Sequence, residues 1–264
     1  GSCTVIASDK TGTLTVNEQT AKKILLPDNT LYNISGTGYE CVGEVSGGNL
    51  DLAKEIALYG LLNNEAKFDG KKRIGDSIDL AFLVLGKKAN VDTSDTKIIG
   101  VIPYESENKY SAVFYEKDNE IFCTVKGSLE VVQGFCKNCN LIKDKVNSGI
   151  LEKQNEDLAS EGYRVIAIAN GKVDKVLEYN EKNIKNLTFM GMVGFIDPIR
   201  KEAVASIKEC HNAGIKVLMI TGDHPLTAYS IAKELGLTKK YEEVTNGDEV
   251  NVYLKKGQDE FDKF

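Results

Sequence analysis

Residues 4–15 read TVIASDKTGTLT, an apolar run that ends in an aspartate, a lysine and a short glycine-containing loop. The run Thr4–Ser8 is short and apolar, which predicts a strand that leads into a glycine loop. Asp9 therefore stands at the carboxyl end of a predicted strand, where open α/β sheets bind their ligands. The backbone amides and hydroxyls of Lys10–Thr13 can approach a phosphoryl group closely. A carboxylate there can attack a phosphoryl group and form an aspartyl-phosphate, and Mg²⁺ is expected because both reactants are anionic.

The later part of the chain shows the alternation of strands and helices that is typical of a parallel sheet. Strands are predicted at Met190–Ile196 and Ile215–Ile220, and helices at Lys201–Ala213 and Pro225–Leu235. Thr4–Ser8 has the same apolar character and no local partner, so it is expected to join this sheet. Two stretches are weakly patterned: 17–49 is polar and glycine-rich, and 241–264 is charged and shows no strong helix.

Residues 22–188 would then form a domain inserted between the two parts, 1–21 and 189–264, of the parallel-sheet domain. The patterns in this insertion predict helices at Leu50–Asn63, Ser77–Lys87 and Ile150–Glu161, and strands at Tyr110–Tyr115, Glu120–Val125 and Tyr163–Ala169. The dipeptide Asp118-Asn119 fits a hairpin turn between two of those strands.

Composition excludes several classes of protein. With 264 residues, of which 42% are hydrophobic and 27% charged, the chain suits one large or two ordinary globular domains. Its net charge of -6 disfavours a nucleic-acid partner. No apolar run approaches the roughly 18 residues of a membrane span, and no signal peptide is visible. Six scattered cysteines suit a reducing compartment. Cys136 and Cys139 could be half a zinc site, although two thiols near a loop is the simpler reading.

The seven residues 9–15, DKTGTLT, match the signature of the P-type ATPases, and on this motif the chain resembles that family. The resemblance implies that Asp9 accepts the phosphoryl group and that Mg²⁺ lies near Asp9 and Thr11. The wider haloacid-dehalogenase-like phosphatases usually carry a second aspartate at the position of Thr11. Its replacement implies a longer-lived acyl-phosphate. The implied fold is α/β: an incomplete haloacid-dehalogenase-like Rossmannoid parallel sheet with a large inserted α+β nucleotide-binding domain on an antiparallel sheet.

Two later motifs follow in the order that the resemblance implies. Asp197-Pro198-Ile199-Arg200 is similar to the family's Asp-Pro-Pro-Arg hinge, with Ile199 as a departure. The segment 221–223 is similar to its Thr-Gly-Asp loop, whose threonine holds phosphate oxygens. The implied catalytic residues are Asp9, Lys10, Thr11, Thr221, Gly222 and Asp223. His211 and His224 are assigned no catalytic role.

The insertion carries the residues that the resemblance implies for ATP. Segment 75–79, GDSID, resembles the family's Gly-Asp/Glu-x-Thr-Glu, so Asp76 and Asp79 would accept from the adenine amino group. Acids are also favoured at any helix N-terminus, which is the alternative. Tyr104 replaces the family's phenylalanine and can stack on adenine, unless it is an ordinary core aromatic. Lys109 follows at the family's spacing and would approach the nucleotide.

Three more residues complete the implied nucleotide site. Lys126 and Gly127 resemble the family's Lys-Gly-Ala, with Ser128 in place of the alanine, and the lysine would supply a flexible charge near the nucleotide. A surface lysine is the alternative. Arg164 stands where the family has a phosphate-contacting arginine. Asp197 and Arg200 are also expected near the nucleotide.

The family's magnesium-binding Gly-Asp-Gly-x-Asn-Asp motif does not occur in residues 224–264. The chain is therefore expected to be a soluble piece of a calcium-pump-like cation ATPase, from the cytoplasmic face of a membrane, that binds ATP with little turnover. Its partners would be ATP and the actuator and transmembrane domains of the parent chain. Two alternatives stay open: a soluble phosphatase or phosphotransferase of the wider superfamily, and a non-catalytic nucleotide-binding module.

Overall fold

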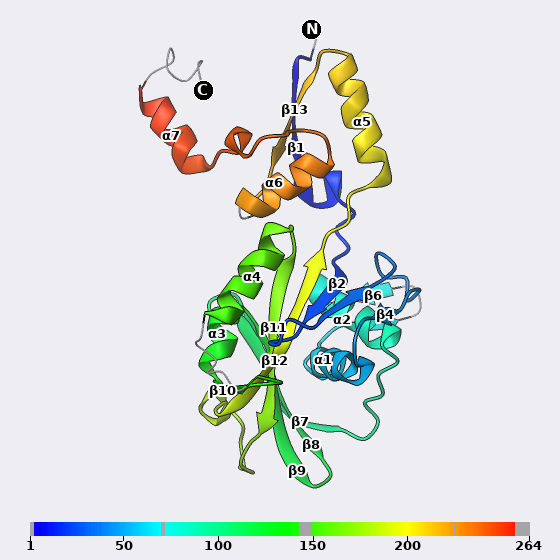
Figure 1. The fold of residues 1–264 in the computed structure, drawn as a ribbon, viewed down its shortest axis with the longest axis vertical. Helices are drawn as coiled ribbons and strands as arrows, with labels where there is room; N and C mark the ends of the chain where they lie inside the picture. The colour runs from blue at the N-terminus through cyan, green and yellow to red at the C-terminus, as the bar shows by residue number, and fades with distance from the viewer. Residues whose placement is uncertain (1–2, 70–71, 143–148, 224, 257–264) are drawn as a thin grey trace. The chain divides into compact units, whose positions relative to one another are not determined.

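The computed structural model describes residues 3–69, 72–142, 149–223 and 225–256 (Figure 1). The chain divides into two compact units. The terminal unit comprises Gly1–Val16, Ser160–Gly162 and Ile199–Phe264, and the central unit comprises Asn17–Ala159 and Tyr163–Pro198. The functional domains predicted from the sequence, 1–21 with 189–264 and 22–188, stay a prediction.

The central unit is built on a mixed sheet of nine strands in which the pairings are antiparallel, except that β10 runs parallel to β12. The strand order is β4-β3-β2-β12-β11-β9-β8-β7. The strands are β2 (Thr20–Leu25), β3 (Leu31–Ile34), β4 (Val45–Ser46), β7 (Lys97–Glu105), β8 (Tyr110–Lys117), β9 (Glu120–Gly127), β10 (Cys136–Cys139), β11 (Arg164–Lys172) and β12 (Leu187–Ile196). The large antiparallel sheet expected for the insertion is confirmed.

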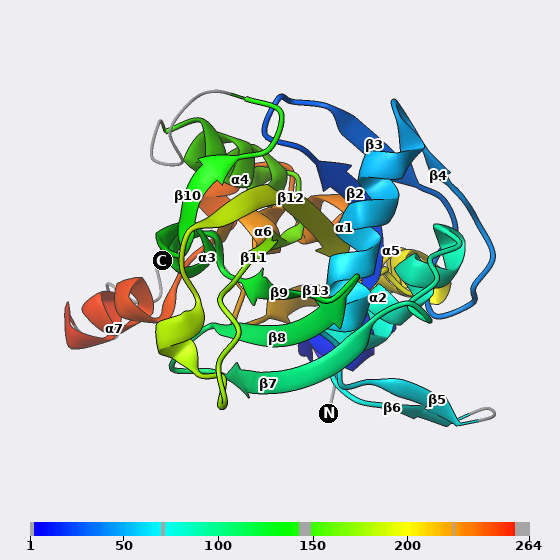
Figure 2. The same ribbon diagram turned by 90° about the horizontal axis from the view of Figure 1, so that it is seen from below.

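Helices cover both faces of this sheet (Figure 2). They are α1 (Leu50–Leu62) and α2 (Ser77–Lys88) on one face, and α3 (Leu129–Gly134) and α4 (Ile150–Ser160) on the other. A small hairpin of β5 (Lys67–Asp69) and β6 (Lys72–Ile74) lies between α1 and α2 in the chain, and the short turn η2 (Glu181–Asn183) precedes β12. The helices predicted at 50–63, 77–87 and 150–161 are confirmed.

Side chains of each strand alternate between two hydrophobic cores because successive Cβ atoms point to opposite faces. On β11, Ile168 packs into the core under α1 and α2, whereas Ala167 and Ala169 face the core under α3 and α4. Gly60 lets the first two helices approach, since a Cβ there would lie 2.2 Å from the ring of Phe82. The sheet therefore carries a core of buried residues on each face.

The hairpin between β8 and β9 turns at Asp118 and Asn119, whose φ angles are 51° and 63°. Both residues are left-handed, as a tight two-residue turn of this hand requires. The hairpin predicted from this dipeptide is confirmed. The polar stretch 17–49, in contrast, contains three strands that its pattern did not indicate.

The terminal unit pairs β1 (Val5–Asp9) in parallel with β13 (Lys216–Ile220). Its other elements are η1 (Lys10–Leu14), α5 (Lys201–Asn212), α6 (Pro225–Glu234), η3 (Tyr241–Glu243) and α7 (Gly247–Lys256). The predicted pairing of the first strand with the strand at 215–220 is confirmed. Leu14 packs with residues of α5, β13 and α6 in the unit's own core.

The assignment of Met190–Ile196 to the parallel sheet is wrong. These residues belong to β12, which runs antiparallel to β2 and β11 in the central unit. The strand is buried on both faces, and a strand of this kind reads as the same apolar run in a parallel or an antiparallel sheet.

The absence of a strong helix in 241–264 is also wrong, because α7 forms there. The Asn246 side chain accepts from the Glu249 amide at 2.9 Å, and the Glu249 carboxylate accepts from the Asn246 amide at 3.3 Å. This reciprocal cap marks the start of the helix, and Val252 within it is exposed. Among the described residues, no helix combines the length and the apolar run needed to cross a membrane.

We expect Phe189→Ala to lower the free energy of unfolding by about 3–5 kcal/mol, because it empties a fully buried site in the core under α3 and α4. Urea unfolding measures the loss. Leu177→Ala is the control, since the Leu177 side chain is fully exposed and its truncation should change stability by less than about 0.5 kcal/mol. Equal losses for both variants would contradict this core assignment.

Candidate functional site

A cavity of about 390 Å³ opens in the central unit, on the sheet face that carries α1 and α2. It is bounded by the end of α1, the start of α2 and the strands β7, β8, β9 and β11. Its lining residues are Leu62, Asn63, Asn64, Glu65, Gly75, Asp76, Ile78, Asp79, Ile98, Val101, Tyr104, Ser111, Val113, Lys126, Gly127, Arg164 and Ile166. An apolar wall with a few converging polar groups is typical of a small-molecule site.

The apolar wall comes from β7. Ile98, Val101 and Tyr104 leave 49%, 50% and 55% of their surface exposed, although they sit beside a well-packed core. Tyr104 is therefore not the ordinary core aromatic that was the alternative. Exposed apolar side chains gathered at a cavity offer a flat surface to an aromatic ring.

Lys126 is buried, with 7% of its surface exposed, and so is not a surface lysine. Its ammonium donates to the Asp79 carboxylate and to the backbone carbonyl of Asn63, and lies 5.3 Å from the centre of the Phe82 ring. Burial lowers the pKa of Lys126, and the Asp79 carboxylate opposes that shift. The group is held in place rather than free to swing.

Asp79 is bound from the other side by the segment that follows α1. The Glu65 amide donates to its second carboxylate oxygen at 3.0 Å, and the Asn64 side chain donates to its backbone carbonyl at 2.7 Å. Asp76 caps α2 by accepting from the Ile78 amide at 2.8 Å. Both predicted acids thus line the cavity while also making contacts within the protein.

Asn63 was not predicted from the sequence. It is buried, and its side chain donates to the carbonyls of Ser111 at 2.8 Å and Thr124 at 3.4 Å. It thereby joins the end of α1 to β8 and β9 while its own carbonyl accepts from Lys126. These partners are far apart in the chain, so no local pattern could have indicated this residue.

Of three further predicted residues, two line the cavity and the third does not. Gly127 lines the cavity, and a Cβ there would lie 2.4 Å from the carbonyl of Lys109, so the close approach of β9 requires glycine. Arg164 is exposed at the start of β11 and lines the cavity. Lys109 is exposed in the turn before β8, and the described lining of the cavity does not include it.

In the terminal unit, Asp9 is exposed at the end of β1, level with Ile220 of β13. Thr221, Gly222 and Asp223 follow that strand directly, so the two predicted motifs meet at one end of the parallel pair. Lys10 is buried and forms an ion pair with Asp223 at 2.7 Å. The pair holds the two loops together.

The loop after Asp9 is shaped by hydrogen bonds. The Thr15 amide and hydroxyl both donate to the Lys10 carbonyl at 3.1 Å, and the Gly12 amide donates to the Thr15 hydroxyl at 3.3 Å. Arg200 donates from its guanidinium to the Gly12 carbonyl at 2.8 Å. Gly12 has φ 76°, which favours glycine. Thr11 and its neighbours are left exposed to a ligand.

Asp197 and Arg200 are separated by the unit boundary. Asp197 is buried in the central unit and accepts from the Glu18 amide at 3.2 Å, and the described lining of the cavity includes neither residue. Their expected roles at the nucleotide stay predictions.

The polar side chains of the two sites are compatible with the nucleotide and the Mg²⁺ ion that the sequence implies. The cavity holds an aromatic wall, carboxylates and two cations, which suits a nucleotide, and the buried Ser111 hydroxyl on its wall has no partner among the described residues. Within the described residues, no cluster of three or more His, Cys, Asp or Glu side chains could hold a metal ion. Mg²⁺ is commonly held by one or two carboxylates together with phosphate and water, so Asp9 and the Thr11 loop fit it in that way.

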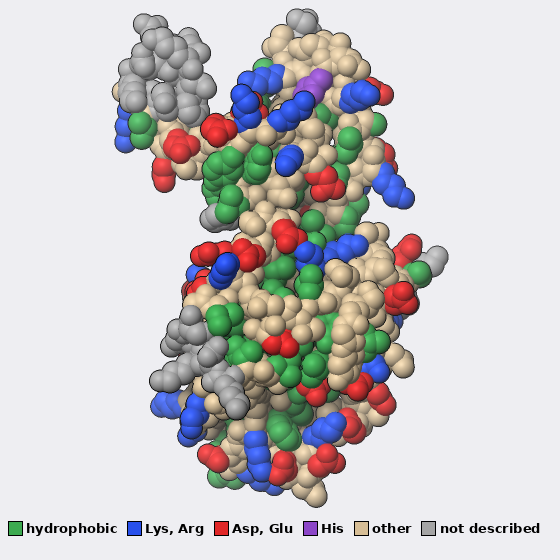
Figure 3. All heavy atoms as spheres, viewed as in Figure 1, with side chains coloured by type: hydrophobic (Ala, Val, Ile, Leu, Met, Phe, Trp, Pro, Cys, Tyr) green, Lys and Arg blue, Asp and Glu red, His purple; other side chains and the backbone are tan. Residues whose placement is uncertain are grey.

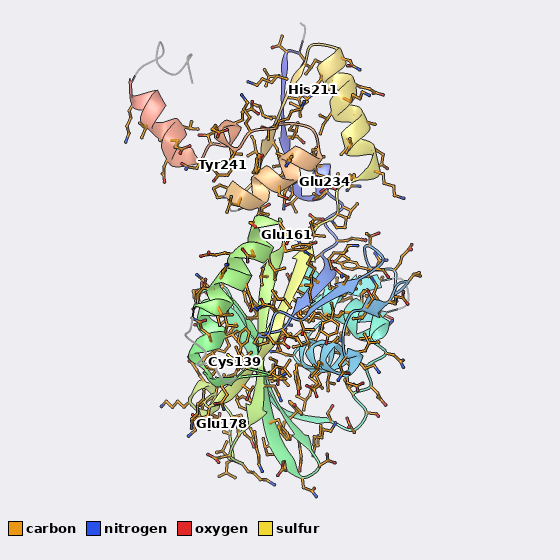
Figure 4. The ribbon with its side chains drawn as sticks, viewed as in Figure 1. Cys139, Glu161, Glu178, His211, Glu234 and Tyr241 are labelled. Carbon is orange, nitrogen blue, oxygen red and sulfur yellow. The ribbon has the colours of Figure 1, made fainter. Side chains whose placement is uncertain are left out.

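Cys136 and Cys139 lie on β10, and Cys139 is buried (Figure 4). The Cys136 thiol donates to the Val132 carbonyl at 3.2 Å, and burial, with a smaller effect of Cys139, raises its pKa to about 12. Both behave as packed thiols. His211 is exposed on α5 (Figure 4), and His224 lies outside the described residues.

Charged side chains of both signs are interspersed on the described face of each unit in Figure 3. The ion pairs described above, Lys126–Asp79 and Lys10–Asp223, each contain a buried lysine. A small charged ligand would therefore be recognised at these points rather than by the general surface.

Residues 52–202 match the family model described as P-type ATPase, cytoplasmic domain N. The chain is 34% identical to the cation-transporting ATPase pma1 of Synechocystis sp. over 90% of this chain and 29% of that protein. It is 31% identical to calcium-transporting ATPase 1 of Bacillus cereus over 95% of this chain and 28% of that protein. Calcium-transporting ATPase type 2C member 1 of Mus musculus is also 31% identical, over 96% of this chain and 28% of that protein. The chain spans less than a third of the length of these relatives.

Lys126→Met should change how stability depends on pH. Because burial lowers the pKa of Lys126 below 10.5 in the folded protein, the unfolded chain binds more protons between that lowered pKa and 10.5. The free energy of unfolding of the natural sequence should rise with pH across this interval, relative to the variant, by at most about 1.4 kcal/mol per pH unit.

Urea unfolding from neutral pH to pH 10.5 measures this difference. The matched control is Lys54→Met, which removes an exposed lysine of α1 and should leave the pH dependence unchanged. If the free energy of unfolding depends on pH in the same way for the natural sequence and for Lys126→Met, burial does not lower the pKa of Lys126 and the prediction is wrong.

Proposed function

Because the chain belongs to the P-type ATPase family, we propose that its central unit binds ATP in the cavity and that Asp9 accepts the γ-phosphoryl group. The observation that carries the proposal is the convergence of Tyr104, Asp79, Lys126 and Arg164 on one cavity of about 390 Å³. These residues come from four separate segments, and their common lining is not required by the packing of the sheet.

The cavity suits the parts of ATP in turn. Tyr104 stacks on the adenine ring, and the carboxylates of Asp76 and Asp79 accept from the exocyclic amino group. Lys126 holds Asp79 in position for this contact and supplies positive charge beside the base. Arg164, exposed at the start of β11, binds phosphate oxygens through its guanidinium. Lys109 is proposed to meet the nucleotide only outside the cavity.

At the terminal unit, a carboxylate oxygen of Asp9 attacks the γ-phosphorus. The new bond joins that oxygen to phosphorus, the bond to the bridging oxygen of the β-phosphate breaks, and ADP leaves. The Thr221 hydroxyl, which accepts from the Asp223 amide at 3.1 Å, keeps its own proton to donate to a phosphate oxygen. Lys10, paired with Asp223, offsets the developing charge.

Asp9 and the Thr11 loop would hold Mg²⁺, and the ion would supply the charge that lets an anionic nucleophile approach an anionic phosphate. The described residues lack a third acid for this ion, so we propose that the chain as given binds ATP with little turnover. The exposed Thr11, in place of a second carboxylate, supports a long-lived acyl-phosphate.

For the whole protein we propose an ATP-driven cation pump of the calcium-transporting branch. The names of the relatives, cation- and calcium-transporting ATPases, support this proposal. The terminal unit would complete a haloacid-dehalogenase-like parallel sheet, and actuator and transmembrane domains of the same chain would be its partners. The two units would then lie at the cytoplasmic face of the membrane.

Tyr104→Ala and Lys126→Ala should each raise the dissociation constant for ATP about tenfold or more, since each removes a contact with the base or its support. Isothermal titration of the chain with ATP measures this. Tyr241→Ala, which removes an exposed tyrosine of the terminal unit, is the control and should bind as the natural sequence does. Unchanged binding by both cavity variants would refute the site.

Asp9→Asn in the full-length protein should abolish labelling by γ-phosphate-labelled ATP, because an amide cannot form an acyl-phosphate. The label on the natural protein should be acid-stable and removed by hydroxylamine, as acyl-phosphates are. Asp248→Asn, on the exposed first turn of α7, should label normally. Labelling of the Asp9 variant at the natural level would place the acceptor elsewhere.

A further inference from the structure

The Ser111 side chain is the one polar group of the described cavity wall that is both buried and without a hydrogen-bond partner among the described residues. Only 5% of the residue's surface is exposed. A buried hydroxyl without a partner costs about 1–3 kcal/mol, so a position of this kind in a folded protein calls for an explanation.

The position of Ser111 on β8 directs its side chain to the cavity. Tyr110 and Ala112, its neighbours along the strand, pack into the core under α3 and α4. Ser111 and Val113 therefore face the opposite side, and both line the cavity. The hydroxyl belongs to the floor of the cavity rather than to either core.

The backbone of Ser111 is held by the end of α1 and by β9. Its carbonyl accepts from the buried side chain of Asn63 at 2.8 Å, and its partner across the sheet is Lys126 of β9. On the other side, the pairing of β7 with β8 is irregular between Ile102 and Glu105, the stretch that carries Tyr104. Ser111 thus lies between the strand of the stacking ring and the strand of the buried ammonium.

We propose that the Ser111 hydroxyl donates a hydrogen bond to a ring nitrogen of the bound base and so helps the cavity to select adenine. This inference rests on the proposed binding of ATP. Ser111 lines the same cavity as Tyr104 and Asp79, so a base held by those two residues would have a ring nitrogen within reach of the unpartnered hydroxyl. A site built to bond a ligand rejects analogues that lack the matching atom.

The first test is Ser111→Ala. It deletes a hydroxyl that has no partner in the protein, so stability should be unchanged or increased, while the dissociation constant for ATP should rise about five- to tenfold. If the Ser111 side chain had only a structural role, its removal would not weaken ATP binding while leaving stability unchanged or increased. Ser111→Thr keeps a hydroxyl and should retain most of the affinity, which also guards against an unexpected folding defect in the alanine variant.

Analogues identify the bond. With the natural sequence, one of 1-deaza-, 3-deaza- and 7-deaza-ATP should bind about five- to tenfold more weakly than ATP, whereas Ser111→Ala should bind that analogue and ATP equally. Ser128→Ala is the matched control. The Ser128 hydroxyl is also buried without a partner among the described residues, but Ser128 does not belong to the described lining of the cavity.

The outcomes separate the two proposals. If the natural sequence does not bind ATP, the proposed function fails and this inference with it. If the natural sequence binds ATP and Ser111→Ala binds it equally well, only the role of Ser111 is overturned. The same holds if each deaza analogue loses affinity by the same factor in the natural sequence and in Ser111→Ala.

Discussion

An ammonium group withdrawn from water must find partners inside the protein, and the packing around Lys126 meets this requirement. Its partners come from two helices: the Asp79 carboxylate and the Phe82 ring from α2, and the Asn63 carbonyl from the end of α1. Any movement of one helix end relative to β9 would leave a charge uncompensated. The geometry of the cavity therefore depends on this one interaction.

The cavity lies where α1 ends at Leu62 and α2 begins at Ser77, and β7 supplies its exposed apolar side chains. Ile98 and Val101 are exposed on this edge strand, although Tyr115 and Val113, their partners on β8, are buried. Apolar surface that no helix covers is available to a flat ligand, and the polar groups at the helix ends give that ligand an orientation.

Sequence patterns predicted the elements whose signal is local. The period of α1 and the turn at Asp118-Asn119 are of this kind. Contacts between distant residues could not be read in the same way: Asn63 acts through carbonyls 48 and 61 positions away. The strand β12 was placed in the wrong sheet because its apolar run fits either kind of sheet. The helix α7 was missed because the Asn246–Glu249 cap that starts it lies in a charged stretch. Motif resemblance supplied Lys109, whose position is outside the described cavity wall.

The first and last strands by which the chain enters and leaves the central unit are neighbours. Thr20 of β2 pairs with Ile196 of β12, and the Glu18 amide donates to Asp197 at 3.2 Å. A segment that starts and finishes at adjoining points can be excised or transplanted without opening a gap in what remains. The segment 17–198, which contains the whole central unit, could therefore be transferred between proteins together with its ligand preference.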